Sequence, residues 1–114
     1  MEGKSPERPV LTSIFIGGTF NGVKITYDPA KCQTAINERG IHFADAASVF
    51  ARPTINLEDR RHDYGEQRFQ TIGFLAGRMV MVVWTPRGDA RHVISMRKCN
   101  DREKKVYQEQ FDKS

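Results

Sequence analysis

The run "MVMVVWT" at residues 79–85 constrains the fold of this chain more than any other feature. Six of its seven residues are apolar, which is typical of a strand that is covered on both faces. Turn-forming sequences flank it, "AGR" before and "PRGD" after. Three further β-prone runs lie at residues 54–58, 68–75 and 90–98. Together they predict an antiparallel meander of about four strands.

A short β-prone run at residues 23–27 and then two helices are predicted ahead of this meander. Asp28 is a good N-cap, Pro29 suits the first helical position, and Gly40 suits the position just past the end. These signals predict a helix over residues 29–39. Apolar side chains recur at helical spacing over residues 43–51 and predict a second helix, whose apolar stripe we expect to join the core.

The order of elements predicts a single α+β domain with a small antiparallel sheet, two N-terminal helices and one C-terminal helix. Asn100 and Glu103 have the spacing of a capping box and predict where the C-terminal helix begins. A length of 114 residues suits one domain with a modest core. Residues 1–22 contain several Pro and Gly and no sustained period, so we expect a poorly ordered extension there. The domain is expected to span residues 23–114.

The charge balance favours an anionic partner. The chain has 18 Lys and Arg against 14 Asp and Glu, a net charge of +4, which suits nucleic acid but is also common in proteins that bind none. Cys32 and Cys99 lie far apart and outside any CxxC pattern, so we expect free thiols rather than a zinc site. No apolar run approaches the roughly 20 residues that span a bilayer. We therefore expect a cytoplasmic protein without membrane contact.

The stretch "EDRRHDYGEQRF" concentrates groups that transfer protons and bind phosphate. Metal-independent RNA cleavage needs a base for the 2′-hydroxyl, a cation for the phosphorane and an acid for the leaving oxygen. His62 and Glu66 suit the acid and base roles, and Arg61 and Arg68 suit phosphate. The structural alternatives are a surface histidine and a Glu66–Arg68 ion pair. One histidine with two nearby acids makes only a weak metal cluster.

The last predicted strand, "ARHVISMRK", carries cations on one face if its side chains alternate regularly. Arg91, Ser95 and Arg97 then surround a single valine on a face open to water or a ligand. His92 and Met96 face the core side. A solvated face with a salt bridge is the structural alternative.

These patterns predict a site without metal or cofactor. The predicted catalytic residues share acid, base or phosphate-binding chemistry: His62, Glu66, Arg68 and Arg97. The predicted RNA-contacting residues are cationic, hydroxyl-bearing or aromatic: Arg61, Arg91, Ser95, Lys98 and Tyr107. Tyr107 also fits the buried stripe of its helix, and Trp84 fits the core of its strand. His42 and His92 receive no role.

Five segments carry a resemblance to a known family: "ITYDPAK", "ERGIHFADAASVF", "RRHDYGEQRFQTIG", "VVWTPRGDARHVISMRK" and the trailing "REKKVY". In this order and spacing the chain resembles the BrnT family of type II toxins, from about Val23 to Phe111. The resemblance implies a fold similar to that of RelE-type ribonuclease toxins and an RNA cleavage that arrests translation. It also implies a BrnA-type antitoxin that neutralises the toxin and represses their shared operon. The toxin would then meet operator DNA only through this antitoxin.

The resemblance places family motifs on numbered positions of this chain. Its "RHxxxExR" pattern falls on Arg61, His62, Glu66 and Arg68, its "ISxR" pattern on Ile94, Ser95 and Arg97, and its closing motif on Arg102, Glu103 and Tyr107. The front differs, because family members begin close to the "KITYD" strand. One hypothesis is that Val23 is the true initiator, and recovery of native peptides from residues 1–22 would exclude it.

Two alternatives to a ribonuclease stay open from the sequence. In the first, the chain is a non-catalytic binding module that acts as co-repressor with a DNA-binding antitoxin. It is also compatible with RNA binding without cleavage, which a salt-dependent shift assay with intact RNA afterwards identifies.

Overall fold

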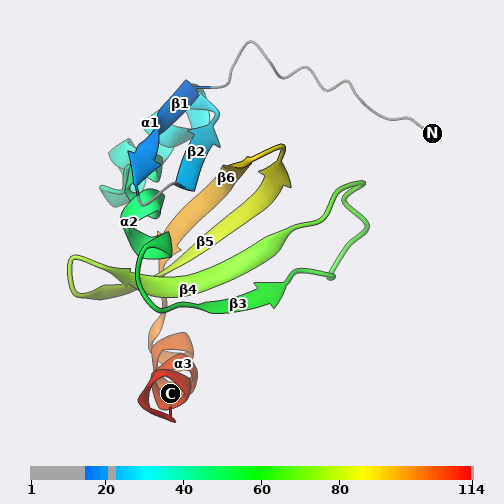
Figure 1. Ribbon diagram of the computed structural model, residues 1–114. Helices are drawn as coiled ribbons and strands as arrows, with labels where there is room; N and C mark the ends of the chain where they lie inside the picture. The colour runs from blue at the N-terminus through cyan, green and yellow to red at the C-terminus, as the bar shows by residue number, and fades with distance from the viewer. Residues whose placement is uncertain (1–14, 21–22, 114) are drawn as a thin grey trace.

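The apolar run at residues 79–85 lies inside a six-stranded sheet in the computed structural model (Figure 1). The structure describes residues 15–20 and 23–113. In spatial order the strands are β1, β2, β6, β5, β4 and β3. Their bounds are β1 (Phe15–Phe20), β2 (Val23–Tyr27), β3 (Ile55–Glu58), β4 (Phe69–Leu75), β5 (Arg78–Arg87) and β6 (Ala90–Lys98).

The predicted meander and α+β class are confirmed. Strands β3, β4, β5 and β6 pair with their sequence neighbours in antiparallel fashion. Two strands extend this sheet: β2 pairs with β6 in parallel, and β1 pairs with β2 in antiparallel fashion. Of the predicted extension at residues 1–22, the structure describes residues 15–20, which form β1, and the remainder lies outside the described residues.

The helices begin and end where local signals place them. The bounds are α1 (Pro29–Arg39), the 3₁₀ turn η2 (Phe43–Asp45), α2 (Ala46–Phe50) and α3 (Asp101–Lys113). The Asp28 carboxylate accepts a hydrogen bond from the Ala30 N–H at 2.9 Å, and Gly40 ends α1 in the left-handed region at φ 69°. The second predicted helix is thus a 3₁₀ turn followed by five α-helical residues. None of the described helices is long and apolar enough to cross a bilayer.

The main core lies between one face of the sheet and the helices α1 and α2, which cover that face. Ile25, Val82 and Met96 from three neighbouring strands are fully buried there with Val49 of α2. Gly73 on β4 permits the close approach of α2, because an added Cβ would lie 2.7 Å from the Val49 Cγ1 atom. Burial of these side chains is the main stabilising contribution to the fold.

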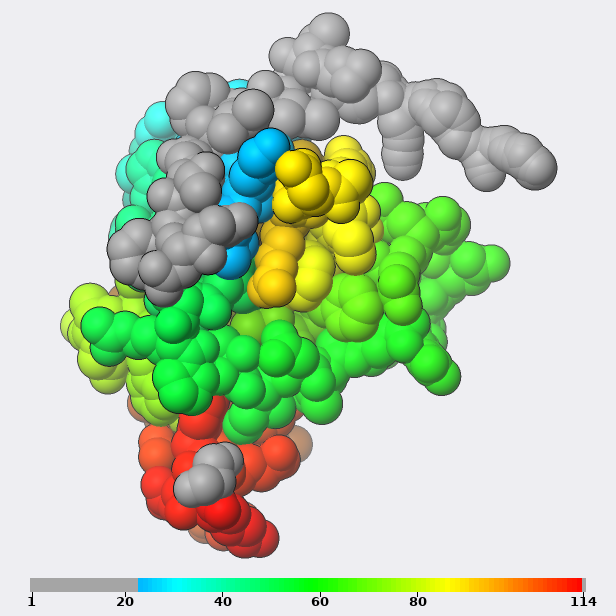
Figure 2. Space-filling view, viewed as in Figure 1, coloured from blue at the N-terminus to red at the C-terminus, as the bar shows by residue number. Residues whose placement is uncertain are grey.

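The opposite side of the sheet, here called the second face, is covered by α3 at one end only. Tyr107 and Phe111 of α3 pack against Ile72, Met79 and Met81 of the sheet. No residue of α3 is itself buried, and Figure 2 shows the helix (red) as a separate lobe at one end of the molecule. The loop between β3 and β4, residues 59–68, projects on another side, as Figures 1 and 2 show.

A β-bulge in β6 decides which side chains reach the second face. Val83 of β5 pairs with Ser95, but Trp84 pairs with Val93, which leaves Ile94 as an extra residue. Val93 and Met96 are three residues apart, yet both belong to the main core. An inserted residue reverses the phase of side-chain alternation beyond it.

The predicted strict alternation of β6 is therefore wrong. Arg91 lies on the helix-covered face, where its guanidinium stacks on Phe50 and Trp84. Arg97 pairs with Met81 and lies on the second face. His92, predicted to face the core side, lies on the second face as well.

Candidate functional site

A buried carboxylate organises the loop at residues 59–68. The Asp59 side chain is 1% exposed and accepts hydrogen bonds from Arg61 Nε at 2.8 Å and Arg61 Nη2 at 2.7 Å. The Tyr64 hydroxyl donates to the same carboxylate at 3.3 Å. The hydrogen bonds from Arg61 hold the pKa of Asp59 well below its usual range. Arg61, a predicted phosphate ligand, thus directs its guanidinium at Asp59 and holds the loop together.

Tyr64 links two of the predicted catalytic residues. The Arg68 guanidinium lies over the Tyr64 ring, 3.9 Å from its centroid. His62 contacts the same ring edge to face, with centroids 5.6 Å apart, and is itself exposed. The loop therefore brings His62 and Arg68 to one place through a shared aromatic ring.

Glu66 lies between two arginines that the fold brings together. Its carboxylate oxygens are 3.6 Å from Arg68 Nε and 3.6 Å from Arg87 Nη2, distances of ion pairs rather than of hydrogen bonds. Arg68 Nε is the one buried side-chain nitrogen or oxygen without a hydrogen-bond partner among the described residues. We call these three residues the Glu66–Arg68–Arg87 cluster. Arg68 Nε itself is enclosed, but the Nη atoms of both guanidiniums make no hydrogen bond within the described residues and keep donors for an anionic ligand.

Arg87 was not among the predicted site residues, because "PRGD" at residues 86–89 was predicted to be a turn. The structure extends β5 through Arg87 and turns only at residues 88–89. The available signal was the alternation of β5, in which Arg87 follows Met81, Val83 and Thr85 on one face.

His92 borders the same cluster. It pairs across the sheet with Thr85 and with Thr26, whose Oγ1 lies 2.8 Å from His92 Nδ1. Burial, and then the positive charge of Arg87, lowers the pKa of His92 to about 4. The Thr85 hydroxyl donates to the Gln67 carbonyl at 2.6 Å and so ties the loop to the sheet. His92 is consequently uncharged at neutral pH.

Arg97 lies at the other end of the second face and has a partner of its own. Its two Nη atoms each donate to Glu103 at 2.8 Å. Glu103 also completes the predicted capping box of α3 with Asn100, and the hydrogen bonds from Arg97 lower the pKa of Glu103 to about 2. Phe69, the residue after Arg68, pairs with Trp84, which lies three residues or roughly 10 Å along β5 from Met81, the cross-strand neighbour of Arg97. The structure does not bring Arg97 to Arg68.

The other predicted RNA-contacting residues are dispersed. Ser95 is half-buried opposite Val83 on the second face. Lys98 is exposed at the end of β6, and Tyr107 packs into the small core beneath α3. Arg91 lies on the helix-covered face. Of these four residues, Ser95 alone lies on the part of the second face that α3 leaves uncovered.

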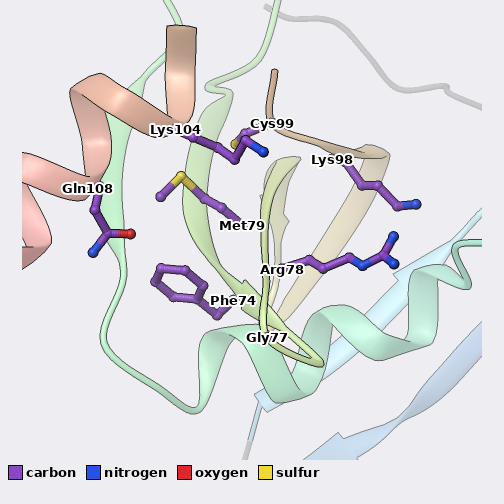
Figure 3. A pocket seen from close by; sticks show the side chains of 8 residues that line it. All are labelled: Phe74, Gly77, Arg78, Met79, Lys98, Cys99, Lys104 and Gln108. Carbon is purple, nitrogen blue, oxygen red and sulfur yellow. The ribbon is translucent and has the colours of Figure 1, made fainter. Parts of the chain in front are cut away.

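A separate cavity of about 350 Å³ lies beside α3 (Figure 3). Phe74, Met79 and Cys99 line it, together with Lys104 and Gln108 of α3. It lies at the end of the sheet away from the Glu66–Arg68–Arg87 cluster. Both cysteines are free and buried, and no group of three metal-ligating side chains occurs within the described ranges.

Comparison with known proteins gives one family. The family model described as "Ribonuclease toxin, BrnT, of type II toxin-antitoxin system" matches residues 27–103. The match spans the organised loop, strands β3 to β6 and the beginning of α3 up to Glu103. A search of curated proteins gave no match.

Proposed function

Because the chain belongs to the BrnT family of ribonuclease toxins of type II toxin–antitoxin systems, we propose that it cleaves RNA at the Glu66–Arg68–Arg87 cluster without a metal ion. The observation that carries this assignment is a carboxylate held between two guanidiniums that keep donors free. A phosphodiester needs such cations in its transition state, and the carboxylate supplies a base beside them.

The proposed reaction is an internal transesterification. The 2′-oxygen forms a bond to phosphorus, and Glu66 takes the 2′-hydroxyl proton. Arg68 and Arg87 stabilise the charge on the non-bridging oxygens of the phosphorane. The bond from phosphorus to the 5′-oxygen then breaks, and His62 donates a proton to that leaving oxygen. The products are a 2′,3′-cyclic phosphate and a free 5′-hydroxyl.

The RNA strand is proposed to lie over the uncovered part of the second face. Gln70, Val83 and Ser95 form one half-buried row across β4, β5 and β6 and lie next to the cluster. This row contributes hydroxyl and amide groups and carries no acidic side chain that would repel phosphate. Ser95 keeps its predicted role as an RNA contact in this arrangement.

We further propose that cleavage arrests translation in the cytoplasm and that a BrnA-type antitoxin neutralises the protein. A type II system has a protein antitoxin, so a protein partner follows from the family. Operator DNA would be contacted through that antitoxin. Induced expression without antitoxin should stop growth, and co-expression of the protein encoded in the same operon should restore it. Normal growth on expression of the folded protein alone would favour the co-repressor alternative.

The direct test is incubation of the purified protein with total RNA in EDTA. Wild-type protein should cleave the RNA, while Arg68→Ala and Arg87→Ala should not. Arg78→Ala is the matched control, since Arg78 is an exposed arginine at the opposite end of β5. Circular dichroism establishes that each variant is folded. Equal cleavage by the two cluster variants and the control would refute the assignment.

A further inference from the structure

One ring nitrogen of His92 has a hydrogen-bond partner within the protein, and the other has none within the described residues. Nδ1 is occupied by Thr26 Oγ1 at 2.8 Å. His92 is 8% exposed. Within the described residues, Arg68 Nε is the one side-chain nitrogen or oxygen that is both fully buried and without a hydrogen-bond partner, so the unpartnered Nε2 of His92 keeps some exposure. Nε2 is therefore reachable by solvent, and the structure gives it no protein partner in residues 15–20 and 23–113. A nearly buried ring with one accessible nitrogen suits a ligand contact.

The charged groups around His92 belong to the proposed site and to the start of α1. Arg87 and Glu66 both act on the ring electrostatically, and Asp28 and Lys31 act on it from α1. Thr85, its neighbour on β5, holds the loop that carries Glu66. His92 thus borders the cluster from the sheet, whereas His62 borders it from the loop.

We propose that His92 is a further RNA-contacting residue, which Thr26 orients through Nδ1 so that the Nε2–H donates a hydrogen bond to a phosphate oxygen beside the Glu66–Arg68–Arg87 cluster. This inference rests on the proposed function and adds a residue and an atom to it. Thr26 is a positioning residue in this scheme, because it acts on the RNA only through His92. The ligand class is a phosphodiester, recognised by one neutral donor and two guanidiniums.

In this proposal His92 acts as a neutral hydrogen-bond donor. This role differs from the acid or base role that the sequence suggested for His62. The low pKa of His92 means that the ring carries one proton at neutral pH. When the Thr26 hydroxyl donates to Nδ1, that proton stays on Nε2. The ring then contributes a hydrogen bond to phosphate without titrating in the physiological range, so it shapes binding and leaves proton transfer to Glu66 and His62.

Two measurements on the full-length protein test this proposal. Long-range ¹⁵N NMR spectra should show the His92 proton on Nε2 at pH 7. Binding of a 2′-O-methyl RNA oligonucleotide, which lacks the attacking hydroxyl, should weaken about tenfold in His92→Ala, the typical effect of one lost hydrogen bond. His92→Gln keeps an amide donor and should bind more tightly than His92→Ala. His42→Gln, on the exposed turn before η2, is the histidine control and should bind like wild type.

Thr26→Val provides a second route if His92→Ala does not fold. It removes the Nδ1 partner with little change in volume and should shift the His92 proton toward Nδ1 and weaken oligonucleotide binding. A proton on Nδ1 in the wild type, or unchanged binding by folded His92→Ala, would overturn the proposal. Such a failure is distinguishable from failure of the proposed function, because cleavage lost in Arg68→Ala but kept in His92→Ala leaves that function standing.

Discussion

Arg68 and Arg97 lie on the same face of the sheet and differ in what already satisfies them. Arg97 directs both Nη atoms at one carboxylate, that of Glu103, with 2.8 Å hydrogen bonds. Arg68 stacks on Tyr64, stands 3.6 Å from Glu66 and keeps Nε without a hydrogen bond. From the sequence alone the two residues cannot be told apart, because each is an arginine close to an acidic residue.

The difference indicates a division of labour along the second face. The Arg97 guanidinium already has hydrogen-bond acceptors within the protein. It therefore links α3 to β6 through Glu103, which belongs to the capping box of that helix. A guanidinium without such acceptors gains hydrogen bonds when an anion binds, so Arg68 is suited to binding phosphate. The predictions below test this division, from the largest expected effect to the smallest.

Arg68→Ala should lower RNA cleavage by about 10²–10³, the typical effect of losing one electrostatic contact to a transition state. The free energy of unfolding should change little, because Arg68 makes no side-chain hydrogen bond within the described chain. Single-turnover cleavage and thermal unfolding measure the two effects. Full activity in a folded Arg68→Ala protein would end the distinction between the two arginines.

Asp59→Asn should destabilise the protein by roughly 2 kcal/mol, since it weakens charge-assisted hydrogen bonds to a buried group. Cleavage should also fall, because Asp59 holds Tyr64, on which Arg68 stacks. Urea unfolding and cleavage by the folded variant separate the two effects. Asp63→Asn, in the same loop but exposed, is the matched control; equal losses in both variants would contradict a special role for Asp59.

The stability of the protein should also depend on pH through His92, which lies beside the Glu66–Arg68–Arg87 cluster. The unfolded chain protonates His92 near its reference pKa of about 6.5, but the folded protein does so only near pH 4. The free energy of unfolding should therefore fall as the pH drops from about 6.5 to 4, by roughly 3 kcal/mol from this group. Urea unfolding of His92→Gln should lack that part of the decline. An identical pH profile in wild type and variant would mean that His92 titrates normally.

Arg97→Ala should cost about 1 kcal/mol of stability, a value reduced for the partial exposure of the ion pair. Cleavage by the folded protein should fall far less than in Arg68→Ala. Glu103→Gln is the companion variant, since it weakens the same pair and the capping box from the other side. A loss of cleavage as large as that of Arg68→Ala would return Arg97 to the catalytic set that the sequence predicted.

Most of the secondary structure is predictable because it depends on local signals. Asp28, Pro29 and Gly40 bound α1 as expected, and Asn100 with Glu103 caps α3. The meander follows from apolar runs separated by turns. The chemical character of the loop was also predictable, since His62, Glu66 and Arg68 carry proton-transfer and phosphate-binding groups in any arrangement.

Only the tertiary structure decided which of these groups meet. The bulge at Ile94 arises where β6 pairs with β5, and it puts His92, instead of Arg91, on the face that carries Arg97. Arg87 joins Glu66 because β5 continues past its predicted end. Residue types and local periodicity are properties of the chain itself, but the phase of a strand and the saturation of an ion pair depend on partners that are distant in sequence.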